Sequence, residues 1–280
     1  GALVRDGATL AQGDPHQDCG PQPELAALPS RASHSDAKGA TADVTLEPCC
    51  HHGKTPPCSE SLISAGFARV VVAMKDPFAK VNGGGLRQLK KAGIETSVGV
   101  LGDEAQQLNA PYLKKVRTGK PWVIAKWAMS IDGRIATVSG ESQWITGEAS
   151  RGQVHRLRGR VDAIAVGMGT VEADDPRLTA RPSGPRVAIR IVFCRHRLPS
   201  VDSMLIKTAN EAPLMLITGQ QIDRTSLALL ESLGAVVIDT RTDDPTEMVE
   251  VALSAIGHNG TTNLMLEGGG DLIASFFAAD

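Results

Sequence analysis

The densest group of potential metal ligands lies in residues 46–58, LEPCCHHGKTPPC, which hold three of the five cysteines and two of the seven histidines. Zinc prefers thiolate sulfur and imidazole nitrogen, and a catalytic zinc uses three protein ligands and leaves one position for water. Cys49 follows a β-branched run and Cys58 opens a segment with helical spacing. We therefore predict a zinc site that uses both thiols. The alternative is that the cysteines are small core residues and that His51 and His52 lie in a solvated loop.

Two glycine clusters in the second half of the chain follow apolar runs. Gly167 and Gly169 end the run AIAVG, and residues 268–270 follow NLMLE. Glycine lets the backbone approach a phosphate, and the free amides at the start of a helix favour a negative charge. Thr170 opens the turn after the first cluster. Turns also need glycine, but two clusters at strand ends indicate a bound phosphate or pyrophosphate.

Short β-branched runs alternate with segments of helical spacing through the first half of the chain. We expect strands at 42–46, 69–74 and 96–100, and a polar helix at 105–118. Helices that end in glycine should lie between the strands. Residues 29–40 are rich in loop-forming residues and are expected to be a surface connection. This alternation predicts a parallel or mixed sheet.

The second half repeats the alternation after Gly119-Lys120-Pro121 breaks the helical pattern. We therefore place a domain boundary there, between domains 1–119 and 120–280, each long enough to bury its own core. The expected strands are 122–130, 163–167, 190–194, 214–218, 235–239 and 263–268, and the expected helices lie near 147–158, 221–233 and 245–256.

Composition limits the possible partners. The chain of 280 residues has a formal net charge of −2, 42% hydrophobic residues and 3% aromatic residues. This balance offers little for nucleic acid or an anionic membrane to bind. No apolar run approaches the roughly 20 residues that span a bilayer, and five cysteines without regular spacing suit a reducing compartment. We expect a soluble α/β protein in the cytoplasm.

Both ends of the chain resemble the interior of a longer sequence. The first residues, GALVRDGATLAQG, predict a strand, a turn and a second strand, which a helix would be expected to precede. The last residues, LIASFFAAD, form an apolar helical pattern without a capping glycine or proline. We therefore expect both ends to be truncated, with a first helix and the last strands missing.

The first half resembles a known enzyme domain. The runs TADVTLEPCCHHGKTPPCSE, GFARVVVAMKDP and NGGGLRQLKKAGIETSVGVL resemble the deaminase domain of the bifunctional riboflavin-biosynthesis deaminase/reductase family, which has a cytidine-deaminase-like α/β/α fold. The resemblance implies that a zinc-bound hydroxide replaces the ring amine of a phosphorylated pyrimidine by a carbonyl. In such deaminases a His-x-Glu motif supplies a zinc ligand and a catalytic glutamate that moves protons.

The stretch that corresponds to His-x-Glu is altered. In GPQPELAAL, Glu24 falls on the proton-moving position and Gln22 on the ligand position. A neutral amide oxygen is a weak zinc ligand beside two thiolates, so His16 or Cys19 would have to supply the third bond. Otherwise the deaminase half is impaired and the protein is a reductase only, with a degenerate or structural zinc domain. Glu24 could also be an ordinary carboxylate in the first turn of a helix.

The second half resembles the reductase domain of the same family. KWAMSIDGRIATVSGESQWITG at 126–147, the run HRLRGRVDAIAVGMGTVEADDPRLTAR at 155–181 and LEGGGDLIASF at 266–276 carry the resemblance. It implies a dihydrofolate-reductase-like fold that uses NADPH to reduce the ribosyl group of the pyrimidine 5′-phosphate to a ribityl chain. Family members form homodimers or larger assemblies through this domain, and we expect the same here.

The resemblance also assigns site residues, and the residue types suit their roles. Arg158 and Arg181 are natural clamps for a phosphate, because the guanidinium fork matches its oxygens. The expected substrate contacts are Ser142, Arg158, Leu178, Arg181 and Glu267, and the expected cofactor contacts are Ala128, Trp144, Thr170, Asp174, Gly269, Gly270, Asp271, Leu272, Ile273, Ala274 and Ser275.

Some of these residues have other readings. Trp144 could be a core aromatic residue and Asp174 a turn carboxylate. Lys126 and Asp174 could assist proton transfer. Where the family commonly has Asp-Ser after the strand at 190–193, this chain has Cys194-Arg195. One cofactor contact is therefore in doubt, although Arg195 could itself face an adenosine 2′-phosphate.

Overall fold

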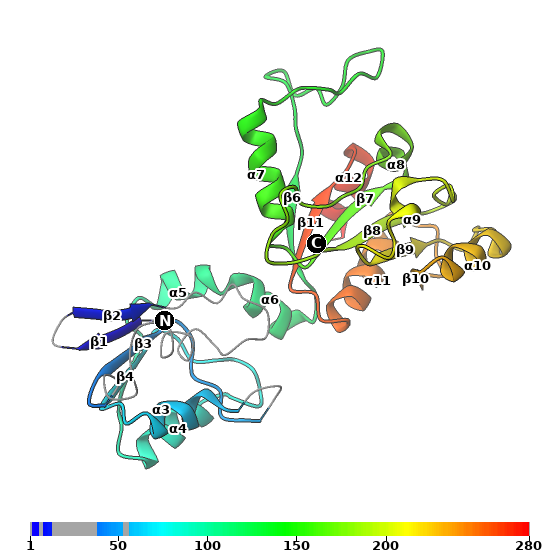
Figure 1. The fold of residues 1–280 in the computed structure, drawn as a ribbon. Coiled ribbons are helices and arrows are strands. Elements are labelled where there is room, and N and C mark those ends of the chain that lie inside the picture. The colour runs from blue at the N-terminus through cyan, green and yellow to red at the C-terminus, as the bar shows by residue number, and fades with distance from the viewer. Residues whose placement is uncertain (1, 6–7, 13–37, 53–55, 280) are drawn as a thin grey trace. The chain divides into compact units, whose positions relative to one another are not determined.

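The chain folds into two compact units, shown in Figure 1. A computed structural model describes residues 2–5, 8–12, 38–52 and 56–279. Unit 1 is Gly1–Arg117 and unit 2 is Thr118–Asp280, and each contains its own β-sheet. Among the described residues no helix is long and apolar enough to cross a membrane.

Unit 1 contains a mixed five-stranded sheet with helices. Its strands are β1 (Ala2–Arg5), β2 (Ala8–Gln12), β3 (Thr41–Val44), β4 (Arg69–Val72) and β5 (Glu95–Val98), and its helices are α3 (Cys58–Ser64), α4 (Gly84–Lys91), α5 (Gly102–Leu108) and α6 (Ala110–Thr118). The strand order is β2-β1-β3-β4-β5, in which β3, β4 and β5 are parallel and β1 pairs antiparallel with β2 and β3. The expected mixed sheet and its alternation with helices are confirmed.

The expected single helix at 105–118 is wrong, because the structure has two helices there. Asn109 ends α5, and its side-chain amide donates to the carbonyl of Ala105 at 2.8 Å. The same amide lies 3.5 Å from the carbonyl of Thr45, the residue after β3. Asparagine favours such local bonds over the helical ladder, so the helix stops and α6 begins at Ala110.

The core of unit 1 lies between its parallel strands and the helices α3 and α4. Alternate residues of the strands are buried because successive side chains of a strand point to opposite faces. Burying each large aliphatic side chain stabilises the fold by about 1.5–3 kcal/mol. The main contributors are Ala42, Val44, Leu62, Val70, Val72, Leu86 and Leu89.

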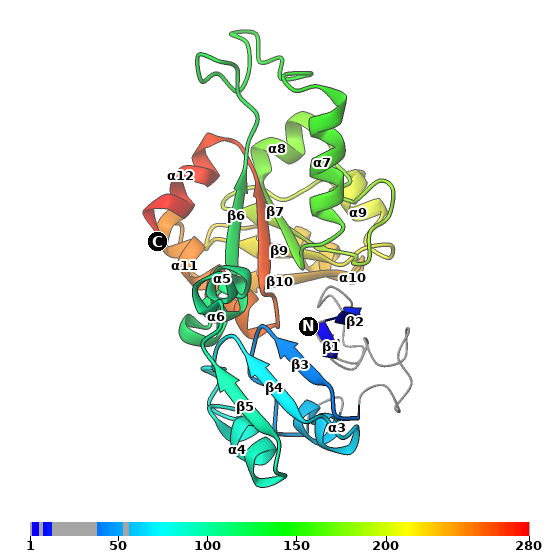
Figure 2. The same cartoon turned by 90° about the vertical axis from the view of Figure 1, so that its left-hand side faces the viewer.

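Unit 2 contains a parallel six-stranded sheet with helices on both faces, as Figure 2 shows. Its strands are β6 (Trp122–Lys126), β7 (Ala163–Gly167), β8 (Ile189–Cys194), β9 (Leu214–Thr218), β10 (Ala235–Asp239) and β11 (Asn263–Glu267), and its helices are α7 (Glu148–Arg158), α8 (Met168–Asp174), α9 (Met204–Lys207), α10 (Arg224–Ser232), α11 (Pro245–His258) and α12 (Gly270–Ala278). The strand order is β10-β9-β8-β7-β11-β6.

Two cores lie on opposite faces of this sheet. Ile164 and Val166 face the helices α8, α9 and α10, whereas Ala163 and Ala165 face α11 and α12. Both faces of the central strands are therefore buried, which explains why these strands are continuous apolar runs in the sequence.

The strand expected at 122–130 is too long. β6 ends at Lys126, which pairs with Glu267, the last residue of β11. Among the described residues the ladder between β6 and β11 does not continue beyond this pair. Residues 127–147 consequently form no helix or strand and project from unit 2 in Figure 1. The side chains of Ile131 and Val138 in this segment are fully exposed.

Candidate functional sites

Cys49 and Cys58 lie together at the amino end of α3, as their spacing predicts. The backbone amide of Cys58 donates to Sγ of Cys49 at 3.3 Å. Ser59 holds the same loop, because its amide and its hydroxyl both donate to the carbonyl of Cys49, at 3.1 and 2.9 Å. Cys58 is fully buried and Cys49 is partly exposed. The thiol of Cys49 therefore lies against the backbone of Cys58, and the binding of a metal by the two thiols remains a prediction.

A buried carboxylate shapes this loop. Glu47 is only 3% exposed, and its oxygens accept hydrogen bonds from the amides of Asp76, Gly83 and Leu86 at 3.3, 2.9 and 3.2 Å. Two of these amides belong to the first turn of α4 or its cap, where a negative charge is favoured. Sequence reasoning missed Glu47. The available signal was a carboxylate beside the cysteine loop and a glycine-rich helix start at 82–85.

Two glycines allow the cysteine loop to approach α4. A Cβ atom on Gly85 would overlap the carbonyl oxygen of Pro48, and one on Gly84 would overlap Sγ of Cys50. The backbone of one segment therefore lies against the backbone of the other, and only glycine fits there.

Gly85→Ala is expected to lower the free energy of unfolding of unit 1 by about 1–3 kcal/mol, because the new methyl group forces the Pro48 carbonyl away. Alanine ordinarily stabilises a helix relative to glycine. The expected loss of stability in Gly85→Ala is therefore opposite to the effect of helix propensity. Urea unfolding followed by hydrogen exchange of the unit 1 amides measures it. Gly102→Ala in α5 is the control, because its Cβ would lie 3.5 Å from the nearest atom. Equal effects of the two variants contradict the prediction.

The remaining members of the predicted zinc site lie outside the described residues. These are Glu24, Gln22, His16 and Cys19. In the described parts of the chain, no group of three histidine, cysteine, aspartate or glutamate side chains could hold a metal ion. The described residues thus offer two thiols and no complete site.

The other side chains of the loop do not complete it. The thiol of Cys50 lies 3.5 Å from the carbonyl of Lys80. Burial raises the pKa of Cys50, and the nearby charge of Glu47 raises it further. Nδ1 of His51 is buried without a hydrogen-bond partner in the described structure, whereas His52 is exposed and lies 3.8 Å from Glu60.

The two glycine clusters of unit 2 lie at one edge of the parallel sheet. β7 and β11 are neighbours, and a Cβ atom on Gly167 or Gly268 would lie 3.5 to 3.7 Å from Cβ of Leu272. A Cβ on Gly269 or Gly270 would meet no atom within 4 Å, so the amino end of α12 is open. Ligands of parallel α/β sheets bind at this carboxyl edge. The predicted contacts Thr170 and Asp271 lie in the first turns of α8 and α12.

A buried ion pair lies beside this edge. Arg158 of α7 binds Glu267 of β11 through Nε at 2.6 Å and Nη2 at 2.8 Å. The side chains of Glu267 and Arg158 are only 8% and 14% exposed. Nζ of Lys126 lies 3.9 Å from the same carboxylate. Two predicted substrate contacts thus bind each other, and most of the guanidinium fork of Arg158 is committed to Glu267.

The loop after α8 carries two more of the predicted substrate contacts, Leu178 and Arg181. The side chain of Leu178 is 3% exposed and packs in the core, with a left-handed backbone φ of 53°. Any contact of Leu178 with a ligand would therefore come from its backbone. The guanidinium of Arg181 is exposed and makes no hydrogen bond or ion pair with another described residue.

His155 was missed by the sequence analysis. Its Nδ1 accepts the backbone N–H of Arg181 at 3.2 Å. The available signal was its spacing from Arg158, because residues three apart share one face of a helix.

The projecting segment contains Ala128, Ser142 and Trp144. Trp144 is 69% exposed, so the alternative of a core aromatic residue is wrong. The guanidinium of Arg151 lies 4.3 Å from the centre of its ring. Nε2 of Gln143 donates to Asp174 at 3.5 Å. The segment is therefore held to α7 and α8, and its apolar rings remain accessible.

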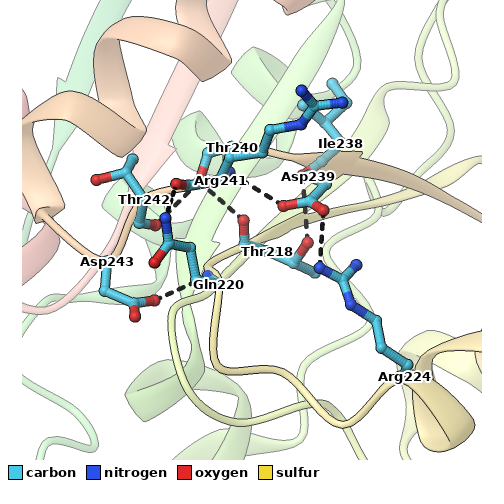
Figure 3. A network of polar contacts seen from close by, with 9 residues as sticks. All are labelled: Thr218, Gln220, Arg224, Ile238, Asp239, Thr240, Arg241, Thr242 and Asp243. Carbon is cyan, nitrogen blue, oxygen red and sulfur yellow. Dashed lines mark hydrogen bonds and ion pairs between the residues drawn. The ribbon is translucent and has the colours of Figure 1, made fainter.

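A polar network joins the loops after β9 and β10, as Figure 3 shows. The hydroxyl of Thr240 donates to the carbonyl of Thr218 at 2.8 Å, and Arg224 donates to Asp239 at 2.9 Å. Burial tends to raise the pKa of Asp239, but the hydrogen bonds from Arg224 and from the amide of Arg241 outweigh it, so the pKa lies below its usual range.

The loop after β8 lies against this network. A Cβ on Gly219 would overlap both the carbonyl oxygen of Arg195 and the carboxylate of Asp243. Cys194 is buried, and burial raises the pKa of its thiol. Arg195 is exposed at this edge.

Comparisons with known proteins agree along most of the chain. The family model described as the RibD C-terminal domain matches residues 121–280. The riboflavin biosynthesis protein RibD of Actinobacillus pleuropneumoniae is 37% identical over 270 residues, which are 96% of this chain and 71% of the relative. RibD of Escherichia coli is 51% identical over 180 residues, which are 64% of this chain and 48% of that protein.

Solved structures extend the similarity to the fold of both units. Acinetobacter baumannii RibD matches with a TM-score of 0.83 and 34% identity over 99% of this chain and 75% of that chain. A Thermotoga maritima structure, named a diaminohydroxyphosphoribosylaminopyrimidine deaminase/5-amino-6-(5-phosphoribosylamino)uracil reductase, matches with a TM-score of 0.80 and 31% identity over 99% of this chain and 76% of that chain. This chain belongs to the RibD family of riboflavin biosynthesis proteins.

Proposed function

We propose that unit 2 is an NADPH-dependent reductase of riboflavin biosynthesis, with a dihydrofolate-reductase-like fold. Its substrate would be 5-amino-6-(5-phosphoribosylamino)uracil, which the name of the Thermotoga relative contains. One observation carries this proposal. The open amino end of α12 and the Arg158–Glu267 pair lie at the same edge, because β11 ends at Glu267 and α12 begins at Gly270. A dinucleotide and a phosphorylated sugar can therefore bind side by side.

The residues at this edge fit the cofactor. The uncovered glycines at 269 and 270 leave room for a pyrophosphate at the helix amino end, and Arg195 offers a charge for a 2′-phosphate. When bound, NADPH would supply a hydride to C1′ of the ribosyl group. The protein positions the two ligands. The proposed cofactor contacts are Ala128, Trp144, Thr170, Asp174, Gly269, Gly270, Asp271, Leu272, Ile273, Ala274 and Ser275.

The proposed substrate contacts divide into two groups. Arg181 would bind the 5′-phosphate, while Ser142, the backbone of Leu178 and the Arg158–Glu267 pair would bind the rest. Ring opening moves the proton of the exocyclic nitrogen to O4′ and leaves an imine at C1′. Reduction at C1′ then requires one proton for the nitrogen. Lys126, held near Glu267 at 3.9 Å, is a proton donor of suitable charge, with Asp174 as the alternative.

NADPH oxidation by the purified chain tests the proposal, with ribityl product identified by mass spectrometry. Arg181→Ala is expected to raise KM for the phosphorylated substrate about 10- to 100-fold, because a hydrogen-bonded charge pair is lost. Arg197→Ala is the control, since Arg197 is exposed and pairs with Glu172 at 2.6 Å. If wild-type protein leaves NADPH unoxidised with this substrate, the proposed function is wrong.

We further propose that unit 1 is a cytidine-deaminase-like zinc domain. The meeting of Cys49 and Cys58 supports it, and these two residues would hold the metal. When bound, zinc would supply a hydroxide nucleophile, with Glu24 moving protons. The alternative is a reductase with a degenerate or structural zinc domain. Ammonia release from the diaminopyrimidine substrate separates these readings, because NADPH oxidation without ammonia release leaves only a reductase.

We also propose that the protein forms a homodimer or a larger assembly through unit 2. Light scattering should then give at least twice the chain mass of 29.4 kDa. A monomeric mass at micromolar concentration contradicts the proposal.

A further inference from the structure

The loop that carries Arg181 is anchored at three successive points. The side chain of Leu178 is buried in the core. Nη1 of Arg158 lies 3.5 Å from the carbonyl of Thr179. His155 then accepts the amide of Arg181 through Nδ1 at 3.2 Å. Because the Arg181 guanidinium has no partner in the described structure, the direction of its side chain depends on how this backbone is held.

The hydrogen bond from the Arg181 amide to Nδ1 of His155 requires a neutral imidazole, because a protonated Nδ1 cannot accept a hydrogen bond. Burial lowers the pKa of His155 below its usual 6.5, and the charges of Arg158 and Arg181 lower it further. The Thr179 carbonyl and Glu267 act in the opposite direction but do not outweigh them. Since the folded pKa is below the unfolded one, this contribution to stability is present above about pH 6.5 and is lost as the pH falls toward the folded pKa.

We propose that neutral His155 is the positioning residue that fixes the backbone of Arg181 and so presents its guanidinium to the 5′-phosphate of the substrate. This inference rests on the proposed reductase function. Protonation of the ring removes the acceptor and adds a third positive charge beside Arg158 and Arg181. The loop is then released at its last anchor, while the Arg158–Glu267 pair remains.

Steady-state reduction by the full chain tests this role. His155→Leu removes the acceptor of the Arg181 amide. We expect KM for the phosphorylated substrate to rise about 10-fold, because one hydrogen bond is worth about 1 kcal/mol and about 1.4 kcal/mol corresponds to a factor of ten. The value of kcat should stay close to that of wild type, because the reacting atoms are not touched. The dephosphorylated substrate, which lacks the group that Arg181 binds, should show no change in KM.

His155→Asn supplies the conservative rescue. Its Oδ1 can accept from the Arg181 amide and does not titrate, so KM should return toward the wild-type value. As the pH falls from 6.5 toward the lowered pKa of His155, the wild-type KM for the phosphorylated substrate should rise because the ring takes a proton, whereas the KM of His155→Asn should not show this rise. His258→Asn on α11 is the matched control, because His258 is exposed and far along the chain from this loop.

Three outcomes decide the matter. A wild-type KM in His155→Leu overturns the inference, and so does an equal loss for phosphorylated and dephosphorylated substrate. If His155→Leu does not fold, a pH profile of His155→Asn identical to that of wild type overturns it instead. The KM of Arg181→Ala distinguishes an error in the positioning role of His155 from an error in the proposed reductase function. When Arg181→Ala raises KM and His155→Leu does not, only the positioning role is wrong.

Discussion

Glu267→Ala is expected to lower the free energy of unfolding of unit 2 by about 3–5 kcal/mol, because it leaves a buried charge without its partner. The Arg158 side chain is 14% exposed and loses two hydrogen bonds, at 2.6 and 2.8 Å. Lys126 would then lie near an uncompensated guanidinium, and the two positive charges repel each other. Reductase activity should fall with the ion pair, since the same carboxylate lies at the proposed substrate site.

Tryptophan fluorescence during urea unfolding measures this effect in unit 2, because the three tryptophans of the chain, Trp122, Trp127 and Trp144, all lie there. Glu172→Ala is the matched control. Glu172 forms an exposed pair with Arg197, and such pairs contribute only about 0–1 kcal/mol. The double variant Glu267→Leu/Arg158→Met should recover much of the lost stability. An unchanged midpoint for Glu267→Ala would show that the pair does not stabilise the fold.

Gln22→His is expected to raise the affinity for zinc by about 100-fold or more, and to bring deaminase activity with it. An imidazole nitrogen replaces a weak amide oxygen beside the thiols of Cys49 and Cys58. Loss of a group that only orients a metal ligand already lowers metal affinity about 10- to 100-fold. Gaining a ligand that binds zinc directly should therefore raise zinc affinity by at least as much. Zinc content after dialysis against a chelator, together with ammonia release, measures both effects.

Gln106→His is the matched control for this gain, because Gln106 is exposed on α5. If wild-type protein already retains one zinc per chain and releases ammonia, Gln22 is no defect. His16→Ala and Cys19→Ser would then identify which residue supplies the third ligand. If neither wild type nor Gln22→His retains zinc, the zinc domain is degenerate and only the reductase proposal remains.

The strands of unit 2 could be predicted closely from the sequence. The runs at 163–167 and 214–218 match β7 and β9, because apolar residues buried on both faces leave a continuous apolar pattern. The run at 235–239 matches the outer strand β10, where β-branched residues favour a strand although much of it is exposed. The run at 122–130 misled, since apolar residues continue after the ladder stops at Lys126. A strand ends where its partner ends, and sequence periodicity does not contain that information.

The candidate sites show the same limit. Cys49 and Cys58 are only nine positions apart along the chain, so local spacing was enough to bring them into contact. Arg158 and Glu267 are 109 residues apart, and their pairing depends on how α7 packs beside β11. Glu47 and His155 bind backbone amides, which every residue except proline offers. Without the topology, no pattern of residue types identifies which amide a side chain will bind.

The position of β6 at the edge of the sheet affects the solubility of the protein. β6 is an outer strand of the six-stranded sheet, so one side of its backbone pairs with no other strand among the described residues. Trp122 and Trp127, at and beyond its ends, are 39% and 47% exposed. An uncovered strand of this kind is a template for adding another strand. Preparations in which nothing pairs with β6 should therefore aggregate at high concentration, and their solubility should improve when a charged residue replaces the exposed Trp122.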